Sequence, residues 1–273
     1  FATNSGSRVT IDSNGKATFS VDGVFNSVNI GKGANSVAGN TAVGEQALDA
    51  SVTGGNNTAF GFKSLSANTS GDINTAIGRQ ALLVNTTGAG NTVIGVNAMD
   101  SNTTGSSNVA VGVNALGLNT TASNNTAIGD ASLKSNTTGT QNVAVGTNAL
   151  DANTTANSNT ACGFNALTAN TTGERNVAVG ADALDANTTG DNNIAIGRNA
   201  LGANTTANNN TAVGYQALVD NSTGNSNTAM GVNALGLNTT ANNNTAVGYF
   251  ALLSNTTGSH NAVLGARALD ANT

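Results

Sequence analysis

The sequence predicts an all-β protein, a parallel β-solenoid (a β-roll or β-helix) with turns of 17 residues that associates as a homotrimeric fibre. A repeat of fixed length fills most of the 273 residues, and each repeat holds one short β-branched segment. These two observations predict the solenoid. A second apolar position in every repeat predicts the association of chains.

The repeat is defined by fourteen glycines that stand 17 residues apart, each with an asparagine four residues before it. Residues 74–82, Asn-Thr-Ala-Ile-Gly-Arg-Gln-Ala-Leu, followed by Asn-Thr-Thr-Gly at 85–88, form one typical unit. The glycines are Gly44, Gly61, Gly78, Gly95, Gly112, Gly129, Gly146, Gly163, Gly180, Gly197, Gly214, Gly231, Gly248 and Gly265. The asparagines are Asn40, Asn57, Asn74, Asn91, Asn108, Asn125, Asn142, Asn159, Asn176, Asn193, Asn210, Asn227, Asn244 and Asn261.

The strict period favours stacked coils over a disordered tract. A flexible linker tolerates insertions, whereas one extra residue in a stacked coil shifts the register of every strand that follows. Seventeen residues extended at roughly 3.3 Å each span about 56 Å, which is enough for one closed turn. A helical repeat needs about 33 residues or more, so a helical solenoid is disfavoured.

Each unit contains one predicted strand and one predicted turn. The segment Thr/Val-Ala-Val/Ile before each repeat glycine reads as the strand, and successive strands would pair in parallel about 4.8 Å apart, giving a rod of roughly 67 Å. The Ala-Leu step after the glycine is compatible with a second short strand or with one helical turn. Asn-Thr-Thr-Gly is a sequence typical of turns.

The two repeated residue types predict structural ladders. Asparagines stacked at one site bond to each other as an amide ladder, and a second series runs from Asn68 through Asn85 and Asn102 to Asn255. The second series also creates Asn-x-Ser/Thr sequences that glycosylation could use in a eukaryotic secretory pathway. Glycine in all fourteen units indicates positive φ or a close backbone approach.

Two apolar stripes run along the predicted coil. Alternation along the strand places Val43 and Ile77 on one side, and Ala42 and Ala76 on the other. A second stripe comes from the Ala-Leu step, starting at Leu48 and ending at Leu269. Because a 17-residue coil encloses little volume, one stripe is expected to fill the coil and the other to face a neighbouring chain. A trimer about a long axis satisfies this expectation, as does a dimer.

Residues 1–39 form a separate lead-in module before the shaft of residues 40–273, whose last repeat is truncated. Residues 8–21 read as a β-hairpin with an Asn-Gly turn at Asn14 and Gly15. Residues 26–31, Asn-Ser-Val-Asn-Ile-Gly, read as an imperfect first repeat, so the module is predicted to start and cap the solenoid. A chain that begins at Phe1 and ends in mid-pattern is interpreted as a segment of a longer protein.

The repeats resemble two families of fibrous proteins. Residues 26–31, and Asn-Ile-Ala-Ile-Gly at 193–197, resemble the Asn-Ser-Val-Ala-Ile-Gly signature of trimeric autotransporter adhesin heads. Residues 210–218 and 221–224 are similar to repeats of phage tail-fibre shafts and related bacterial surface fibres. The second resemblance covers residues 40–273. It implies a trimeric spacer of the virion tail that projects a receptor-binding tip, with a host cell-surface receptor or glycan bound by regions outside this segment. The alternative that it implies is a bacterial cell-surface adhesin or extracellular fibre.

The remaining residues predict no enzyme, no cofactor and no metal site. The charged residues make up 8% of the chain and do not cluster, so a nucleic-acid partner is not expected. No apolar run approaches the roughly 20 residues of a membrane span. His260 is predicted to lie in a solvated loop, and Cys162 to be a small buried apolar residue.

A different class of function, ice binding, is suggested by the adjacent threonines of each turn, such as Thr86 and Thr87. Adjacent side chains in a turn are not expected to share one flat face, which weighs against that function. The position after each repeat glycine is the most variable. If the shaft binds sugars, Tyr215 and Tyr249 at this position are candidate platforms, although packing between chains is the favoured use.

Overall fold

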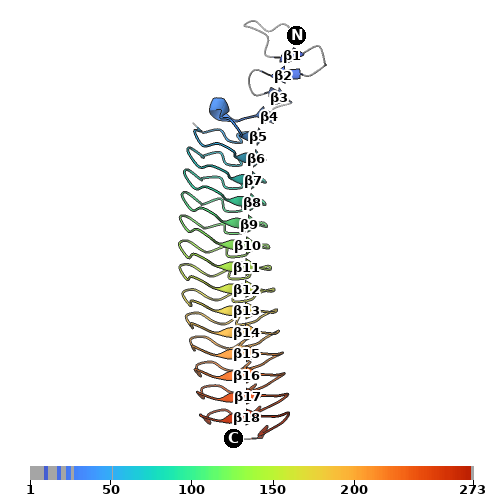
Figure 1. Cartoon of the computed structure of the whole chain (residues 1–273), viewed down its shortest axis with the longest axis vertical. Helices are drawn as coiled ribbons and strands as arrows, with labels where there is room; N and C mark the ends of the chain where they lie inside the picture. Colours follow the sequence, from blue (N-terminus) through green and yellow to red (C-terminus); the bar gives the residue numbers. More distant parts are fainter. Residues whose placement is uncertain (1–8, 12–16, 20–22, 26–27, 51, 272–273) are drawn as a thin grey trace.

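The structure is a computed structural model that describes residues 9–11, 17–19, 23–25, 28–50 and 52–271. It is a long, narrow parallel β-solenoid with one short strand per turn (Figure 1). The all-β class and the 17-residue turn predicted from the sequence are confirmed. The parallel strands are β5 Thr41–Val43, β6 Thr58–Phe60, β7 Thr75–Ile77, β8 Thr92–Ile94, β9 Val109–Val111, β10 Thr126–Ile128, β11 Val143–Val145, β12 Thr160–Cys162, β13 Val177–Val179, β14 Ile194–Ile196, β15 Thr211–Val213, β16 Thr228–Met230, β17 Thr245–Val247 and β18 Ala262–Leu264.

The strands stack without any shift of register. Ala127 of β10, for example, pairs with Ala144 of β11, and every other parallel pair likewise joins residues that are 17 positions apart. Equivalent positions of successive turns therefore form straight columns along the solenoid. A residue type that repeats in the sequence becomes a continuous ladder or stripe in the structure.

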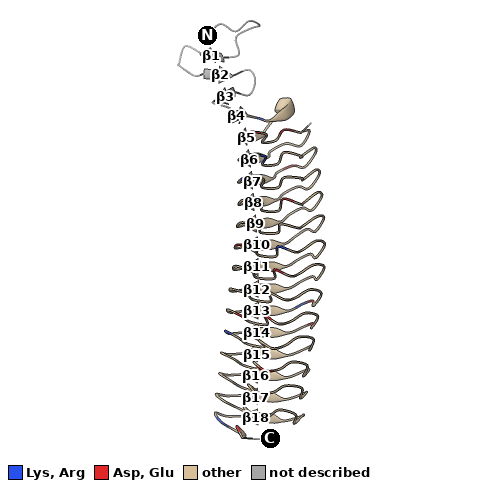
Figure 2. Cartoon of the chain, turned by 180° about the vertical axis from the view of Figure 1, so that it is seen from behind, with Lys and Arg blue, Asp and Glu red and all other residues tan. Residues whose placement is uncertain are grey.

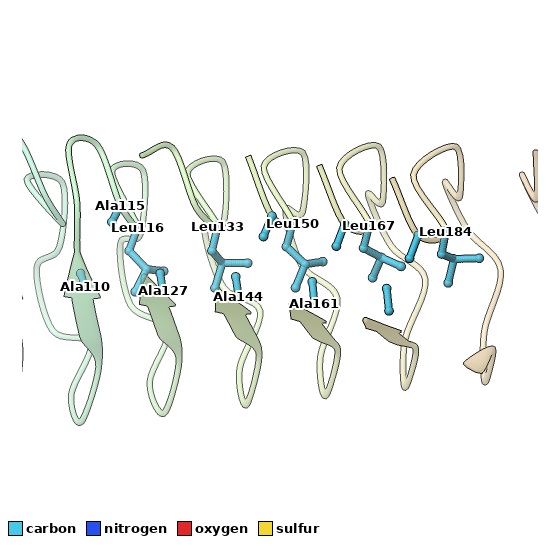
Figure 3. Close-up of a cluster of buried hydrophobic side chains, with 14 of the residues drawn as sticks. Ala110, Ala115, Leu116, Ala127, Leu133, Ala144, Leu150, Ala161, Leu167 and Leu184 are labelled. Atoms are coloured by element: carbon cyan, nitrogen blue, oxygen red, sulfur yellow. The ribbon is translucent and has the colours of Figure 1, made fainter. Parts of the chain in front are cut away.

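The interior of the coil is filled by small residues and one leucine or methionine per turn. The middle residue of each parallel strand, Ala in all but β8 and β18, points inward and meets the Leu or Met side chain that comes from the opposite segment, as Figure 3 shows for Ala127 and its neighbours. Leu116, Leu133 and Leu150 are fully buried. The Leu stripe therefore fills the coil, while the first and third residues of each strand face outward.

The Ala-Leu step is a tight turn, and neither of the two elements considered from the sequence forms there. Gln80 has a φ of 58° and Leu82 a φ of 54°, so two left-handed residues reverse the chain and aim the Leu side chain inward. The Leu82 N–H donates to the carbonyl of Ala98 in the next turn, at 3.0 Å. Because β-branched side chains are strongly disfavoured at positive φ, Leu or Met occupies this place and Val and Ile do not.

The lead-in contains two antiparallel pairs. Strand β1 (Val9–Ile11) pairs antiparallel with β2 (Ala17–Phe19), as a hairpin requires, and the Asn-Gly turn between them lies outside the described residues. Strand β3 (Gly23–Phe25) pairs antiparallel with β4 (Val28–Gly31), and β4 pairs with β5. A 3-10 turn, η1 (Ala34–Ser36), connects β4 to the first coil.

Strand β4 corrects the prediction that residues 26–31 are an imperfect first repeat. It runs antiparallel to β5, with Ile30 opposite Val43, and so is not a turn of the solenoid. The reason is the spacing: Gly31 stands 13 residues before Gly44, four short of a full turn, and the chain must reverse instead of coiling. The Gly44 N–H donates to the Asn29 carbonyl at 2.9 Å, so β4 covers the exposed edge of the first coil.

Candidate functional site

The repeat glycines from Gly44 to Gly248 lie where a side chain would meet the backbone of the next turn. Gly146 has a φ of 134°, and a Cβ added to it would stand 2.4 Å from the carbonyl oxygen of Gly163 in the next turn. Its N–H donates to the Ile128 carbonyl of the preceding turn at 2.7 Å. Positive φ and close backbone approach, the two reasons considered from the sequence, therefore act together.

The first asparagine series lies inside the coil and links successive turns. The Asn142 backbone N–H donates to Oδ1 of Asn125 at 2.9 Å, and Oδ1 of Asn142 accepts the N–H of Asn159 at 3.0 Å. Nδ2 of Asn142 donates to the Ala156 carbonyl at 2.8 Å. One side chain thus satisfies buried backbone groups of two turns, which is a structural task.

The second asparagine series forms a separate buried ladder. Nδ2 of Asn136 donates to Oδ1 of Asn119 at 3.1 Å and to the Gly139 carbonyl at 2.9 Å. The members of this series are fully buried: Asn68, Asn85, Asn102, Asn119, Asn136, Asn153, Asn170, Asn187, Asn204, Asn221, Asn238 and Asn255. A glycan on any of these side chains is incompatible with the folded coil.

Secretion through a eukaryotic pathway is therefore expected to prevent folding. Oligosaccharide is attached to the chain before it folds, and each Asn-Thr-Thr of the second ladder is an acceptor sequence. The expected product is a glycosylated chain that trypsin degrades rapidly. The same chain made with glycosylation inhibited should resist trypsin, and a glycosylated, protease-resistant product would contradict the buried ladder.

A third ladder, which sequence reasoning missed, runs along the surface. Backbone N–H groups donate to side chains one turn further on, as from Ala89 to Oγ of Ser106 at 3.0 Å and from Glu174 to Oδ1 of Asp191 at 2.7 Å. The sequence does not reveal this ladder because its position holds Ser, Asp or Asn, which share only a side-chain oxygen that can accept a hydrogen bond. The acceptors are Asp72, Ser106, Ser123, Asn157, Asp191, Asn208, Asn225, Asn242 and Ser259.

The threonine pairs do not form a doubled flat array. Oγ1 of Thr86 donates to the Thr103 carbonyl at 3.0 Å and is half-buried, whereas Thr87 is exposed. The first hydroxyl of each pair is thus used within the coil. An ice-binding face built on both threonines has no support in this geometry.

The outward-facing third residue of each strand forms a continuous apolar column, which we call the outer stripe. Its residues are Val43, Phe60, Ile77, Ile94, Val111, Ile128, Val145, Cys162, Val179, Ile196, Val213, Met230, Val247 and Leu264. Fourteen turns carry an apolar residue here although the position faces solvent; Phe60 is 55% exposed and Met230 45%. An exposed apolar column of this length marks a candidate interaction surface.

The outer stripe corrects the prediction that Cys162 is buried. The thiol is exposed on β12 because the third strand residue points away from the coil interior. The neighbouring column after the repeat glycines is more tolerant, since it holds Glu45, Arg79 and Asp130 besides the exposed Tyr215 and Tyr249. Charged residues lie on the connecting segments and not on strands β5–β18 (Figure 2).

The described residues contain no group of three or more His, Cys, Asp or Glu that could hold a metal ion. His260 is exposed in its turn, with a φ of 64°. In the same part of the chain, no helix has the length and apolar character that crossing a membrane requires.

Three carboxyls sit in a partly buried row on the turn side. Loss of solvent raises the pKa of Asp100, Asp151 and Asp185 above the ordinary value of 3.8. The nearby Asp182 raises the pKa of Asp185 further, whereas Lys134 acts in the opposite direction on Asp151.

Mild acid is expected to stabilise the solenoid through these three groups. Since their pKa is higher in the folded state, the folded chain binds more protons, so stability rises as pH falls from neutral through the folded pKa values and levels off below about 3.8. Thermal melting at pH 7 and at pH 4 checks this. Replacing all three (Asp100→Asn, Asp151→Asn and Asp185→Asn) should reduce the rise, and a melting temperature that falls on acidification would refute it.

Comparison of the chain with protein-family models, with curated proteins and with solved structures finds no match. Function must therefore be argued from the geometry itself.

Proposed function

We propose that this chain is a structural fibre segment of a phage tail fibre, a homotrimeric shaft that projects a receptor-binding tip for host attachment from the virion tail. Its role is mechanical, and the proposal includes no enzymatic activity. Stacked strands and side-chain ladders make a stiff rod of roughly 67 Å. The alternative, a bacterial surface adhesin or extracellular fibre, uses the same mechanics.

The observation that carries this proposal is the outer stripe. The fourteen side chains are partly to largely exposed, from Val111 to Leu264, and together they present on the order of 1,000 Å² of surface. This is comparable to the roughly 800 Å² per partner of a standard interface. Burial of the stripe against identical chains removes this apolar surface from water. Identical chains also share the same rise per turn, so their stripes stay matched along the whole rod.

Closed symmetry favours a trimer about the rod axis. A single stripe on each chain can meet its copies around one axis, and three rods leave no stripe residue facing solvent. A dimer covers the stripe as well, and measured mass separates the two. The resemblance of the repeats to phage tail-fibre shafts supports the trimer.

The test is the absolute mass of the chain in solution by light scattering. A mass of three chains is expected for the wild type and for the control Thr147→Asp, in the column next to the stripe. The double variant Ile128→Asp and Ile196→Asp should be a folded monomer, because both outward side chains lie in the stripe. A folded wild-type monomer would overturn the proposal.

A further inference from the structure

An open groove of about 380 Å³ crosses the first three turns of the shaft. Two columns line it: Gln46, Lys63 and Gln80 stand two residues after the repeat glycines, and Asp49, Ser66 and Leu83 stand five residues after them. Positive φ values of 56–58° hold the first column in one orientation. The groove is within the roughly 300–1,000 Å³ of small-molecule sites, at the lower end.

The polar side chains of this groove are unpaired. Over the described part of the chain, the side chains of Gln46, Asp49 and Gln80 have no hydrogen-bond or ion-pair partner, and Lys63 has a ring contact alone, with its Nζ 5.3 Å from the centre of Phe62. Donors and acceptors therefore converge from three turns without satisfying each other.

The same columns are used differently further along the rod. In the first column, Nδ2 of Asn148 donates to Oδ1 of Asn165 at 3.2 Å, and Nδ2 of Asn165 donates to Oδ1 of Asp182 at 3.3 Å. These three side chains form a short chain of hydrogen bonds along the column, whereas Asn114, Asn199 and Gln216 of the same column form no side-chain hydrogen bond in the described structure. In the first three turns Lys63 stands between the two glutamines, and no side-chain hydrogen bond joins these three residues in the described structure.

The charges of the groove indicate the class of ligand. One ammonium and one carboxylate give the lining no net charge, so an anion would meet Asp49 and a metal cation would meet Lys63. Two amides and the Ser66 hydroxyl add neutral donors and acceptors, while Ala50 and Leu83 add a small apolar patch. A sugar ring has the matching features, since hydroxyls surround its edge and C–H groups form its face.

We infer that this groove is a subsite for a neutral, hydroxyl-rich ligand, a hexose unit of a glycan chain. The groove lies on the segment that carries the Ala-Leu turn. In the later turns drawn in Figure 3 this segment lies across the coil interior from the strands, and the constant 17-residue register puts the groove on the same side. The outer stripe is on the outward face of those strands. The groove therefore remains open when the stripe is buried, so this side of the shaft binds glycan independently of any tip.

Saturation-transfer NMR on the full chain tests the inference with neutral trisaccharides of glucose, galactose and mannose as probes. At least one probe should give a saturable signal. The double variant Lys63→Ala and Gln80→Ala should weaken binding by about tenfold, because two hydrogen-bonding groups are lost. The control, Lys134→Ala with Gln216→Ala, changes the same residue types outside the groove, with Gln216 in the first column and Lys134 in the second, and should bind as the wild type does.

Three results would overturn the glycan subsite: no saturable signal with any trisaccharide, equal binding by the groove variant, or saturation of the groove by inorganic phosphate or Ca²⁺ instead. Both variants change side chains outside the core, and circular dichroism checks that they fold. Light scattering on the same samples tests the trimer separately from the glycan subsite. A trimer that binds no sugar refutes the subsite alone, and a monomer that binds sugar refutes the trimer alone.

Discussion

Gly146→Ala is expected to break the solenoid in its middle. The substitution forces an L side chain to a φ of 134° and places its Cβ 2.4 Å from a backbone oxygen of the next turn. Strain at such a φ costs about 1–3 kcal/mol by itself, and the backbone overlap brings the expected loss to about 4 kcal/mol or more. The two neighbouring turns cannot move away from residue 146 without disturbing their own hydrogen bonds to the turns beyond them.

The chain itself provides the control for Gly146→Ala. Gly139 belongs to the turn position at which Ala122, Ala156 and Ala207 occur naturally, and its φ is not positive. A Cβ added there would also approach a backbone oxygen, that of Ala156, but the natural alanines show that the coil accommodates it, so Gly139→Ala should lose much less stability than Gly146→Ala. Stability in a repeat array is nearly a sum of nearest-neighbour terms. We therefore expect the Gly146 variant to melt in two steps and to be cleaved by proteases near its seventh turn. If the Gly146 variant melts in a single step close to the melting temperature of the wild type, the backbone at this turn can move apart to accommodate the Cβ, and the expected break in stacking is refuted.

The architecture is predictable from the sequence because the residues that determine it recur at a fixed spacing. The 17-residue spacing of Gly44 and its equivalents allows stacking in one register, and alternation around Ala76 separates the inward from the outward residues. Where the period fails, prediction fails too. Residues 26–31 look like a repeat, but the interval from Gly31 to Gly44 decides the direction of β4.

Other features escaped prediction because they depend on geometry that the repeat does not encode. Positive φ at the Ala-Leu step was missed although Asn, which favours left-handed φ, often stands at its first position, as in Asn97 and Asn148. The second position, as in Leu82, holds a residue type that does not indicate positive φ. The third ladder uses Ser106 and Asp191 alike, so no residue pattern reveals it. The groove is lined by residues of three turns, from Gln46 to Leu83, and this grouping appears when the turns are stacked side by side.

Asn142→Asp tests whether the buried ladder stabilises the coil through its donor. The carboxylate keeps the shape and the acceptor oxygen, but it loses the N–H that satisfies the Ala156 carbonyl at 2.8 Å. A buried charge then faces an unsatisfied carbonyl. At pH 7 we expect a loss of about 3–5 kcal/mol, measured by urea unfolding.

Acid should restore the stability of the Asn142→Asp variant. Burial raises the pKa of a carboxyl, and the protonated form regains a donor for the Ala156 carbonyl, so the lost stability returns as pH falls through that raised value. Asn233→Asp is the matched control, since its column holds Asp182 naturally and its side chain is partly exposed. This control should lose little stability at pH 7. A loss at Asn142 that does not change between pH 7 and pH 4 would mean that the amide donor is dispensable, and that packing of the column alone holds neighbouring turns together.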